Sequence, residues 1–157
     1  MSVAVEHLVE YYQGVFEARF RGLPIINPSL EVEAVGFRPL DEHEFGALIT
    51  PWFINLVLLP GTGRWDDSPQ GSICNIEFPG GKVDFTVSHD EELGTTLSAA
   101  MFGTVADFPE QAMARDIAGE TLRLLFSKPQ IDDDARGARM TRRELFRNLG
   151  SAAGDEP

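Results

Sequence analysis

The sequence predicts an α+β fold, in which a mostly antiparallel sheet, arranged as a meander, is flanked by an N-terminal and a C-terminal helix. Residues 3–20 and 107–125 repeat apolar side chains every three or four positions, the period of an amphipathic helix. Between them, residues 74–101 alternate apolar and polar side chains, the period of strands with one buried face. This order favours a single domain with the helices packed on one side of the sheet.

The first helix is expected over about residues 3–20. Ser2 is a suitable N-cap, and Gly22-Leu23-Pro24 ends the helix because proline cannot continue it. A turn at Asn27-Pro28-Ser29 then leads into a strand near residues 31–38. The apolar face of the helix consists of Val5, Leu8, Tyr12, Val15, Phe16 and Phe20.

Two short apolar runs in the centre, residues 45–50 and 53–59, are separated by Pro51-Trp52. Because proline has no N–H to donate to a neighbouring strand, an edge, a bulge or a break is expected at Pro51. Residues 55–59 are almost all apolar, which indicates a strand covered on both faces.

Three strands in succession, near residues 74–78, 82–88 and 96–101, favour the antiparallel meander. Pro79-Gly80-Gly81 joins the first two and is typical of a hairpin turn. The single cysteine, Cys74, falls on the apolar side of its strand and is interpreted as a buried structural thiol.

The second helix is expected to open at Asp107, with Glu110 three residues later in the capping-box position and Pro109 tolerated near the start. It ends before Ser127-Lys128-Pro129. Residues 1–131 are predicted to form one domain. Residues 132–157 are predicted to form a partly disordered tail, with a short helix near residues 139–149.

Charge is unevenly distributed along the chain. The net charge of −12 arises in residues 1–127, which hold 7 basic and 19 acidic side chains, whereas residues 135–150 carry five arginines against Glu144. An acidic body disfavours nucleic acid as a partner and favours basic peptides. Acidity that serves only solubility is the alternative reading.

Several functional classes find no support in the sequence. There is no apolar run long enough for a membrane span and no visible signal peptide, so a cytoplasmic protein without membrane insertion is expected. His7, His43 and His89 lack metal-ligand spacing, and no nucleophile elbow or phosphate-binding loop occurs. We therefore predict no enzyme, no metal and no cofactor. The turn at residues 89–92 is interpreted as a solvated loop.

Three features remain as candidate partner-binding surface. They are Thr50-Pro51-Trp52-Phe53, the Phe78-Pro79 turn and the basic tail. The alternatives are that Trp52 and Phe53 fill the core and that the turn is ordinary hairpin chemistry. The tail sequence Thr141 to Arg147 resembles a twin-arginine motif through Arg142, Arg143, Leu145 and Phe146. It either mimics a client or, the favoured reading, is a basic helix against the acidic body or a free tail.

Several segments taken together, spanning roughly residues 5–147, resemble the HybE family of nickel–iron hydrogenase assembly chaperones, called HupJ in some operons. The most specific segment runs from Ile49 to Gly61. The others are Phe78-Pro79-Gly80, Phe85-Thr86-Val87, Leu97 to Phe102, the helix from Phe108 to Leu125, and Arg142-Arg143.

The resemblance implies a non-catalytic chaperone that acts in the cytoplasm on the hydrogenase small subunit and its twin-arginine signal peptide before export. The large subunit and other maturation proteins are further expected partners, and the oligomeric state stays open. The alternative is a small-molecule or redox-linked accessory module of the same maturation system. The chain has no Cys-x-x-Cys pair, so it would hold no rubredoxin iron itself.

Overall fold

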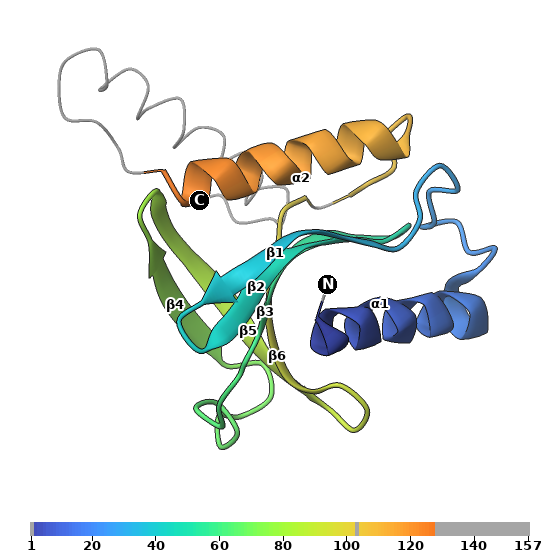
Figure 1. Ribbon diagram of the computed structural model, residues 1–157. Coiled ribbons are helices and arrows are strands. Elements are labelled where there is room, and N and C mark those ends of the chain that lie inside the picture. The colour runs from blue at the N-terminus through green and yellow to red at the C-terminus, as the bar shows by residue number, and fades with distance from the viewer. Residues whose placement is uncertain (1, 103, 128–157) are drawn as a thin grey trace, which may run out of the picture.

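The computed structural model describes residues 2–102 and 104–127, and it contains one six-stranded antiparallel sheet with a long helix on each face (Figure 1). The predicted α+β architecture is confirmed. The elements in chain order are α1 (Val3–Val15), the π-helical turn η1 (Phe16–Phe20), β1 (Glu33–Leu40), β2 (His43–Ile49), β3 (Ile54–Leu59), β4 (Ile73–Phe78), β5 (Gly81–Asp90), β6 (Gly94–Ala100) and α2 (Gln111–Leu125).

The sheet consists of two three-stranded meanders joined side by side, in the order β1-β2-β3-β6-β5-β4. The predicted meander is the second of these, and the pairing of Cys74 with Phe85 and of Phe78 with Gly81 sets its register. The two meanders meet where β3 pairs with β6, Leu58 opposite Leu97. The strands β1 and β4 are therefore the two edges of the sheet.

The expectation that both helices pack on one side of the sheet is wrong, because α1 and α2 cover opposite faces (Figure 1). Consecutive residues of a strand point to opposite faces. In β2, Ala47 and Ile49 face the α2 side, whereas the intervening Leu48 packs with Leu8 of α1. Since both faces of β2 are apolar, each needs a cover.

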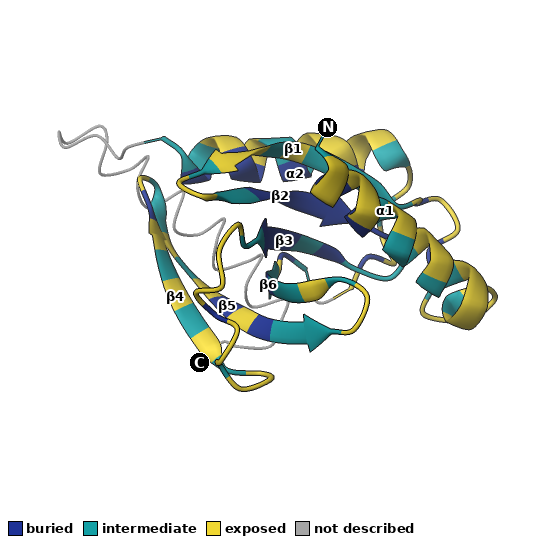
Figure 2. Cartoon of the chain, turned by 60° about the horizontal axis from the view of Figure 1, so that its bottom comes forward, coloured by how far each residue is buried: buried dark blue, intermediate teal, exposed yellow. Residues whose placement is uncertain are grey.

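The larger part of the core lies between the sheet and α2. Figure 2 shows that buried residues concentrate in β2 and β3, at the centre of the sheet. The expectation that residues 55–59 form a strand covered on both faces is confirmed, since Leu56 and Leu58 pack on the α2 side and Val57 on the α1 side. The buried apolar residues that α2 contributes are Ala114, Ala118, Leu122 and Leu125.

The predicted break at Pro51 is a tight turn between β2 and β3. The Thr50 hydroxyl accepts hydrogen bonds from the backbone N–H groups of Trp52 (3.2 Å) and Phe53 (2.9 Å), and it donates to the Phe53 carbonyl (3.0 Å). The Thr50 N–H donates to the same carbonyl at 2.8 Å. Because the turn needs no N–H from residue 51, proline is accommodated there.

The predicted helix starts have different outcomes. Ser2 caps α1 as predicted, since its hydroxyl accepts from the Val5 N–H at 3.2 Å; it also donates to the Glu44 carboxylate of β2 at 2.7 Å. The predicted start of α2 at Asp107 is wrong. The helix begins at Gln111, and its capping residue Glu110 makes no side-chain cap.

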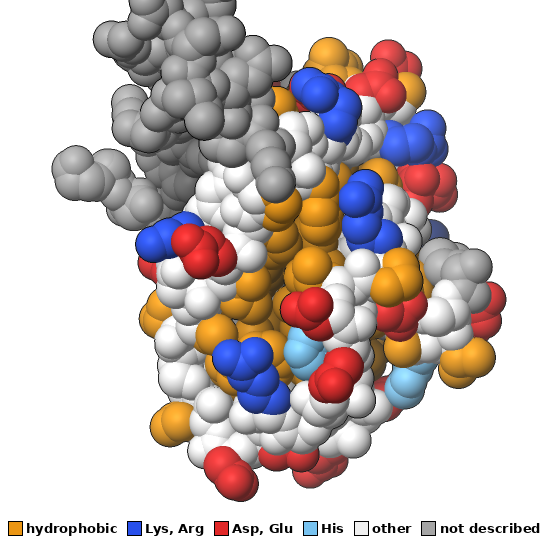
Figure 3. Space-filling model, turned by 60° about the vertical axis from the view of Figure 1, so that its left-hand side comes forward, with side chains coloured by type: hydrophobic (Ala, Val, Ile, Leu, Met, Phe, Trp, Pro, Cys, Tyr) orange, Lys and Arg blue, Asp and Glu red, His pale blue; other side chains and the backbone are white. Residues whose placement is uncertain are grey.

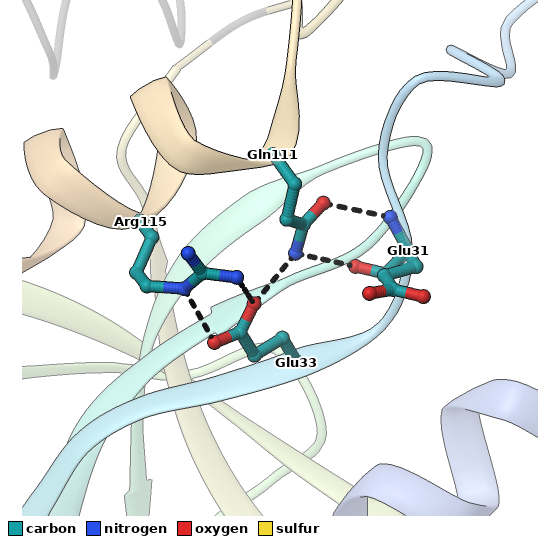
Figure 4. Close-up of polar contacts among 4 residues, drawn as sticks. All are labelled: Glu31, Glu33, Gln111 and Arg115. Carbon is teal, nitrogen blue, oxygen red and sulfur yellow. Dashed lines mark hydrogen bonds and ion pairs between the residues drawn. The ribbon is translucent and has the colours of Figure 1, made fainter.

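The first turn of α2 is held by side chains from a distant part of the sequence instead (Figure 4). Arg115 donates to both carboxylate oxygens of Glu33 in β1, at 2.8 and 3.0 Å, and the Gln111 amide donates to the same carboxylate at 2.8 Å. The Gln111 carbonyl oxygen accepts from the Glu31 N–H at 2.9 Å. The hydrogen bonds that Glu33 accepts from Arg115, which have the larger effect, and from Gln111 lower the pKa of its carboxyl group.

Gly61 and Gly80 lie where an added side chain would collide with a backbone carbonyl group. A Cβ on Gly61 would lie 1.7 Å from the Glu42 carbonyl oxygen, and a Cβ on Gly80 would lie 2.0 Å from the Leu124 carbonyl oxygen. The Gly80 N–H donates to the Leu125 carbonyl at 2.7 Å. The β4–β5 turn thus closes against the C-terminal end of α2.

Candidate functional site

An aromatic platform forms where the end of the first helical segment meets the β2–β3 turn. Trp52 stacks on Phe20 with ring centroids 4.5 Å apart and lies parallel to Phe16 at 6.1 Å. Phe53 and Tyr12 meet edge to face at 5.4 Å. All five rings are half-buried, so each keeps a surface open to solvent. The platform is defined as Tyr12, Phe16, Phe20, Trp52 and Phe53.

The helical segment widens into a π-helix at the platform. Phe16 to Phe20 form η1, so the phenyl rings of Phe16 and Phe20 both reach the indole of Trp52. Such π-helical turns are uncommon and often occur at functional sites. Trp52 also borders a hollow of about 410 Å³, which is lined by Pro24, Ile25, Ile26, Asn27, Pro28, Trp52, Thr104, Val105 and Ala106.

An acidic hollow of about 590 Å³ lies beside the platform, between α1 and the β5–β6 turn. It is bordered on one side by Glu10 and on the other by the acidic run at residues 90–92. The rings of Tyr11 and Tyr12, 5.0 Å apart, connect it with the platform. The hollow is lined by Glu10, Tyr11, Gly14, Val15, Ala18, Arg19, Asp90, Glu91 and Glu92.

One hydrogen bond joins the two walls of the acidic hollow. The Tyr11 hydroxyl donates to the Asp90 carboxylate at 2.9 Å, and the other carboxylate oxygen accepts from the N–H groups of Leu93 (2.9 Å) and Glu92 (2.8 Å). The hydrogen bond from the Leu93 N–H has the largest effect on the pKa of Asp90 and lowers it, and the bond from the Glu92 N–H lowers it further. Burial, followed by the bond to Asp90, raises the pKa of Tyr11 to about 12. At neutral pH the carboxylate is therefore charged and the phenol protonated.

The predicted binding residues are divided between the two faces of the sheet. Trp52 and Phe53 belong to the platform, but Thr50 is 0% exposed and Pro51 is buried, so both support the turn instead of offering contact surface. Phe78 lies on the α2 side, 4.8 Å from Phe45, and is 5% exposed. In the predicted Phe78-Pro79 turn, therefore, only Pro79 is exposed.

Sequence reasoning missed the place of Phe16, Phe20 and Tyr11 at this candidate site. The first two were assigned to the buried face of a helix, and no local signal indicated that Trp52 would stack on them. The turn at residues 89–92 is only partly the solvated loop that was expected. Glu91 and Glu92 are exposed, but Asp90 is tied to Tyr11, and the His89 ring lies 2.6 Å from the Ser68 carbonyl oxygen.

Cys74 is half-buried, so the prediction of a buried thiol is wrong in degree. Its side chain does face the α2-side core, but β4 is an edge strand and one side of it is uncovered.

No group of three or more His, Cys, Asp or Glu side chains that could hold a metal occurs among the described residues. No helix in the same part of the chain is long and apolar enough to cross a membrane. Arg142, Arg143, Leu145 and Phe146 lie outside the described residues, as does the predicted tail at 132–157.

Comparison with known proteins identifies the family. The model of the NiFe-hydrogenase assembly chaperone HybE family matches residues 3–148. The hydrogenase expression/formation protein HoxT of Azotobacter vinelandii is 38% identical over 148 residues, which cover 92% of this chain and 96% of that protein. A protein of Rhodobacter capsulatus named probable rubredoxin HupJ is 31% identical over 139 residues, covering 88% of this chain and 50% of that protein.

A solved structure shares the fold. The solution structure of HybE from Escherichia coli superimposes with a TM-score of 0.63 at 19% identity, covering 83% of this chain and 82% of that one. At this identity the likeness concerns the fold alone, whereas the family match covers nearly the whole sequence. The chain belongs to the HybE family of nickel–iron hydrogenase assembly chaperones, a family of hydrogenase maturation proteins.

Proposed function

We propose that this protein is a non-catalytic, cytoplasmic chaperone that binds the hydrogenase small subunit and its twin-arginine signal peptide before export. The observation that carries this proposal is the position of the acidic hollow directly beside the aromatic platform along one helical segment. A twin-arginine signal is basic ahead of an apolar stretch, so it matches that order of surfaces. The large subunit and other maturation proteins are further partners under the same proposal.

The acidic hollow suits guanidinium groups. Glu10, Glu91 and Glu92 are exposed, and arginine pairs with carboxylates through two parallel charge-assisted hydrogen bonds. Asp90 is held in its charged form by its backbone partners, so it adds negative potential without needing a cation of its own. The exposed Arg19 at the same hollow is a cation that an incoming arginine pair must outcompete.

The platform suits the apolar part of the peptide. Trp52 presents a half-buried indole whose position is set by Phe16 and Phe20, so little side-chain entropy is lost when a ligand packs on it. The adjoining hollow adds Ile25, whose side chain is 58% exposed. Tryptophan and tyrosine of this kind are the residue types that most often anchor protein interfaces.

Binding of a synthetic signal peptide tests the proposal. A labelled peptide with the Arg-Arg pair should bind, and its Lys-Lys counterpart should bind about tenfold more weakly, because ammonium groups cannot form the paired bonds. The double variant Glu91→Gln/Glu92→Gln should weaken binding and flatten its dependence on salt. The matched control, Glu110→Gln/Asp116→Asn, removes two exposed carboxylates from the α2 side and should bind like the parent chain. Equal loss in both double variants would mean that only net charge matters, and no binding at all would refute the proposal.

The second candidate is a redox-linked accessory module of the same maturation system. It is favoured by one observation, the similarity to a relative of twice the matched length named probable rubredoxin HupJ. A pull-down of the tagged chain from cells that express a matching hydrogenase separates the two candidates. Capture of the small subunit that depends on its signal peptide supports the chaperone. Capture of an iron-containing electron carrier without a hydrogenase subunit supports the accessory module.

A further inference from the structure

An apolar trough opens on the side of the molecule opposite the acidic hollow (Figure 3). It lies where β4 and β5 curve away from β1 and β2 (Figure 1). Its rim consists of half-buried side chains from three strands and from the residue that follows α2: Leu40, Cys74, Ile76, Val83 and Phe126. These side chains pack against the buried core cluster that contains the aromatic residues Phe45, Phe78 and Phe85.

The trough exists because α2 is too narrow to cover the whole face of the sheet. The helix packs on β1 and β2, and among the described residues no other helix lies on that face. The half-buried residues of β4 and β5 therefore remain without a cover of their own. An apolar surface of this kind normally binds another polypeptide segment, because leaving it in water is unfavourable.

The described chain ends at one end of this trough. Phe126, directly after α2, lies 5.7 Å from the Phe78 ring and 5.9 Å from the Phe45 ring, and Arg38 covers it at 4.0 Å. The bond from the Gly80 N–H to the Leu125 carbonyl fixes that exit against the β4–β5 turn. Thirty residues follow Ser127, so the rest of the chain starts beside the trough.

We propose that residues 139–149 of the same chain dock into this trough. In the helix that the sequence predicts over residues 139–149, Leu145, Phe146 and Leu149 would share one face and supply an apolar strip. The eleven residues from 128 to 138 can span roughly 35 Å when extended, enough to return along a domain of this size. Five arginines between residues 135 and 150 are attracted to a body that carries −12.

The extent of the family match supports an occupant from within the chain. The match runs to residue 148 and so includes the segment, which makes it part of the unit that relatives share. An attached segment also has a high effective concentration and outcompetes free peptides of similar affinity. A partner that uses the trough must therefore displace residues 139–149 first. This proposal does not depend on where the signal peptide binds.

Cys74 is a built-in probe of the trough, because it is the only cysteine and it lies on the rim. In the full-length chain, the rate at which a maleimide modifies Cys74 should rise roughly tenfold in the variant Leu145→Asp/Phe146→Asp, since an uncovered thiol reacts faster. The variant Ala152→Asp/Ala153→Asp adds the same charge beyond the segment and should leave the rate unchanged. Circular dichroism checks that all variants stay folded.

A second probe separates docking from a general loosening of β4. In the background Cys74→Ser/Glu77→Cys, the thiol lies on the opposite face of β4, and its labelling rate should not respond to the tail substitutions. If Cys74 labels equally fast with and without Leu145→Asp/Phe146→Asp, the segment does not occupy the trough and the proposal is wrong. If protection of Cys74 increases with protein concentration, the occupant belongs to a second copy, which also overturns it.

Discussion

The two faces of the sheet are covered in different ways. Among the described residues, eighteen buried side chains form one continuous core on the α2 side. The buried cluster on the α1 side has only Leu8, Leu48 and Val57, with Val5 of α1 also buried, and the rest of that contact is half-buried. The first face holds most of the apolar surface removed from water, so it carries most of the stability. The second face keeps aromatic rings and carboxylates available to solvent, as a binding surface requires.

The largest effect should come from the α2-side core. Phe45→Ala removes a ring that is 0% exposed and contacts Phe78 and Phe85, so we expect a loss of about 3–5 kcal/mol in the free energy of unfolding. Leu48→Ala, on the same strand but facing α1, should cost less, about 2–3 kcal/mol. Urea unfolding followed by circular dichroism measures both losses. Equal losses would mean that the two faces contribute alike.

Gly80→Ala should be the next most harmful change. The added Cβ would meet the Leu124 carbonyl oxygen, so the β4–β5 turn must separate from the end of α2 at about 1–3 kcal/mol. Gly119→Ala is the matched control, because nothing lies within 4 Å of its Cβ and alanine favours the helix by up to about 1 kcal/mol. Thermal unfolding should give a lower midpoint for the first variant and a higher one for the second. A neutral Gly80→Ala would contradict the close approach.

Trp52→Ala tests whether the α1 side can loosen independently. Loss of the stacked indole should lower the free energy of unfolding by about 1–2 kcal/mol, less than for the buried phenylalanine, because Trp52 is only half-buried. Hydrogen exchange should show faster exchange in α1 and η1 and unchanged protection in α2. Uniform acceleration across both helices would mean that the faces unfold together.

Tyr11→Phe should have the smallest effect, a few tenths of a kcal/mol up to about 1 kcal/mol, because it deletes one partly solvated hydrogen bond. Because the pKa of Asp90 is lowered by folding, its contribution to stability is fully present above the ordinary carboxyl pKa. That contribution is lost as the pH falls through the pKa that Asp90 has in the folded protein. The raised pKa of Tyr11 means that its contribution is present below pH 10 and is lost as the pH rises towards about 12. The difference in stability between parent and variant, measured against pH, should therefore shrink at both extremes.

Periodicity was sufficient for the elements themselves. The apolar spacing of residues 3–20 corresponded to a helical segment, and the alternation around Cys74 and Phe85 corresponded to a hairpin. The proline at position 51 corresponded to a break between two strands. The start of α2 was not predictable in this way. Its first turn is held by Glu33, about eighty residues away, so the capping pattern of Asp107 and Glu110 was outweighed by a contact without a local signature.

The candidate site was predictable only in part, for a similar reason. Trp52 and Phe53 were candidates because they are two large aromatics beside the strand break that Pro51 predicts. Their partners Phe16 and Phe20, and the approach of Asp90 to Tyr11, depend on how a helix docks on a sheet. The helix α1 packs on the face of the sheet where Leu48 and Val57 point towards it, and these two residues belong to strands that are apolar on both faces.

The sequence by itself determined the class of fold, the order of helices and strands, the acidic character of the body and the family resemblance, because each depends on composition or on spacing over a few residues. The tertiary structure alone decided that the helices lie on opposite faces. It also decided that an acidic hollow adjoins the aromatic platform and that the α2 face is left open at β4. These features require residues far apart in the chain to meet, and such meetings depend on the packing of whole elements, which leaves no local pattern in the sequence.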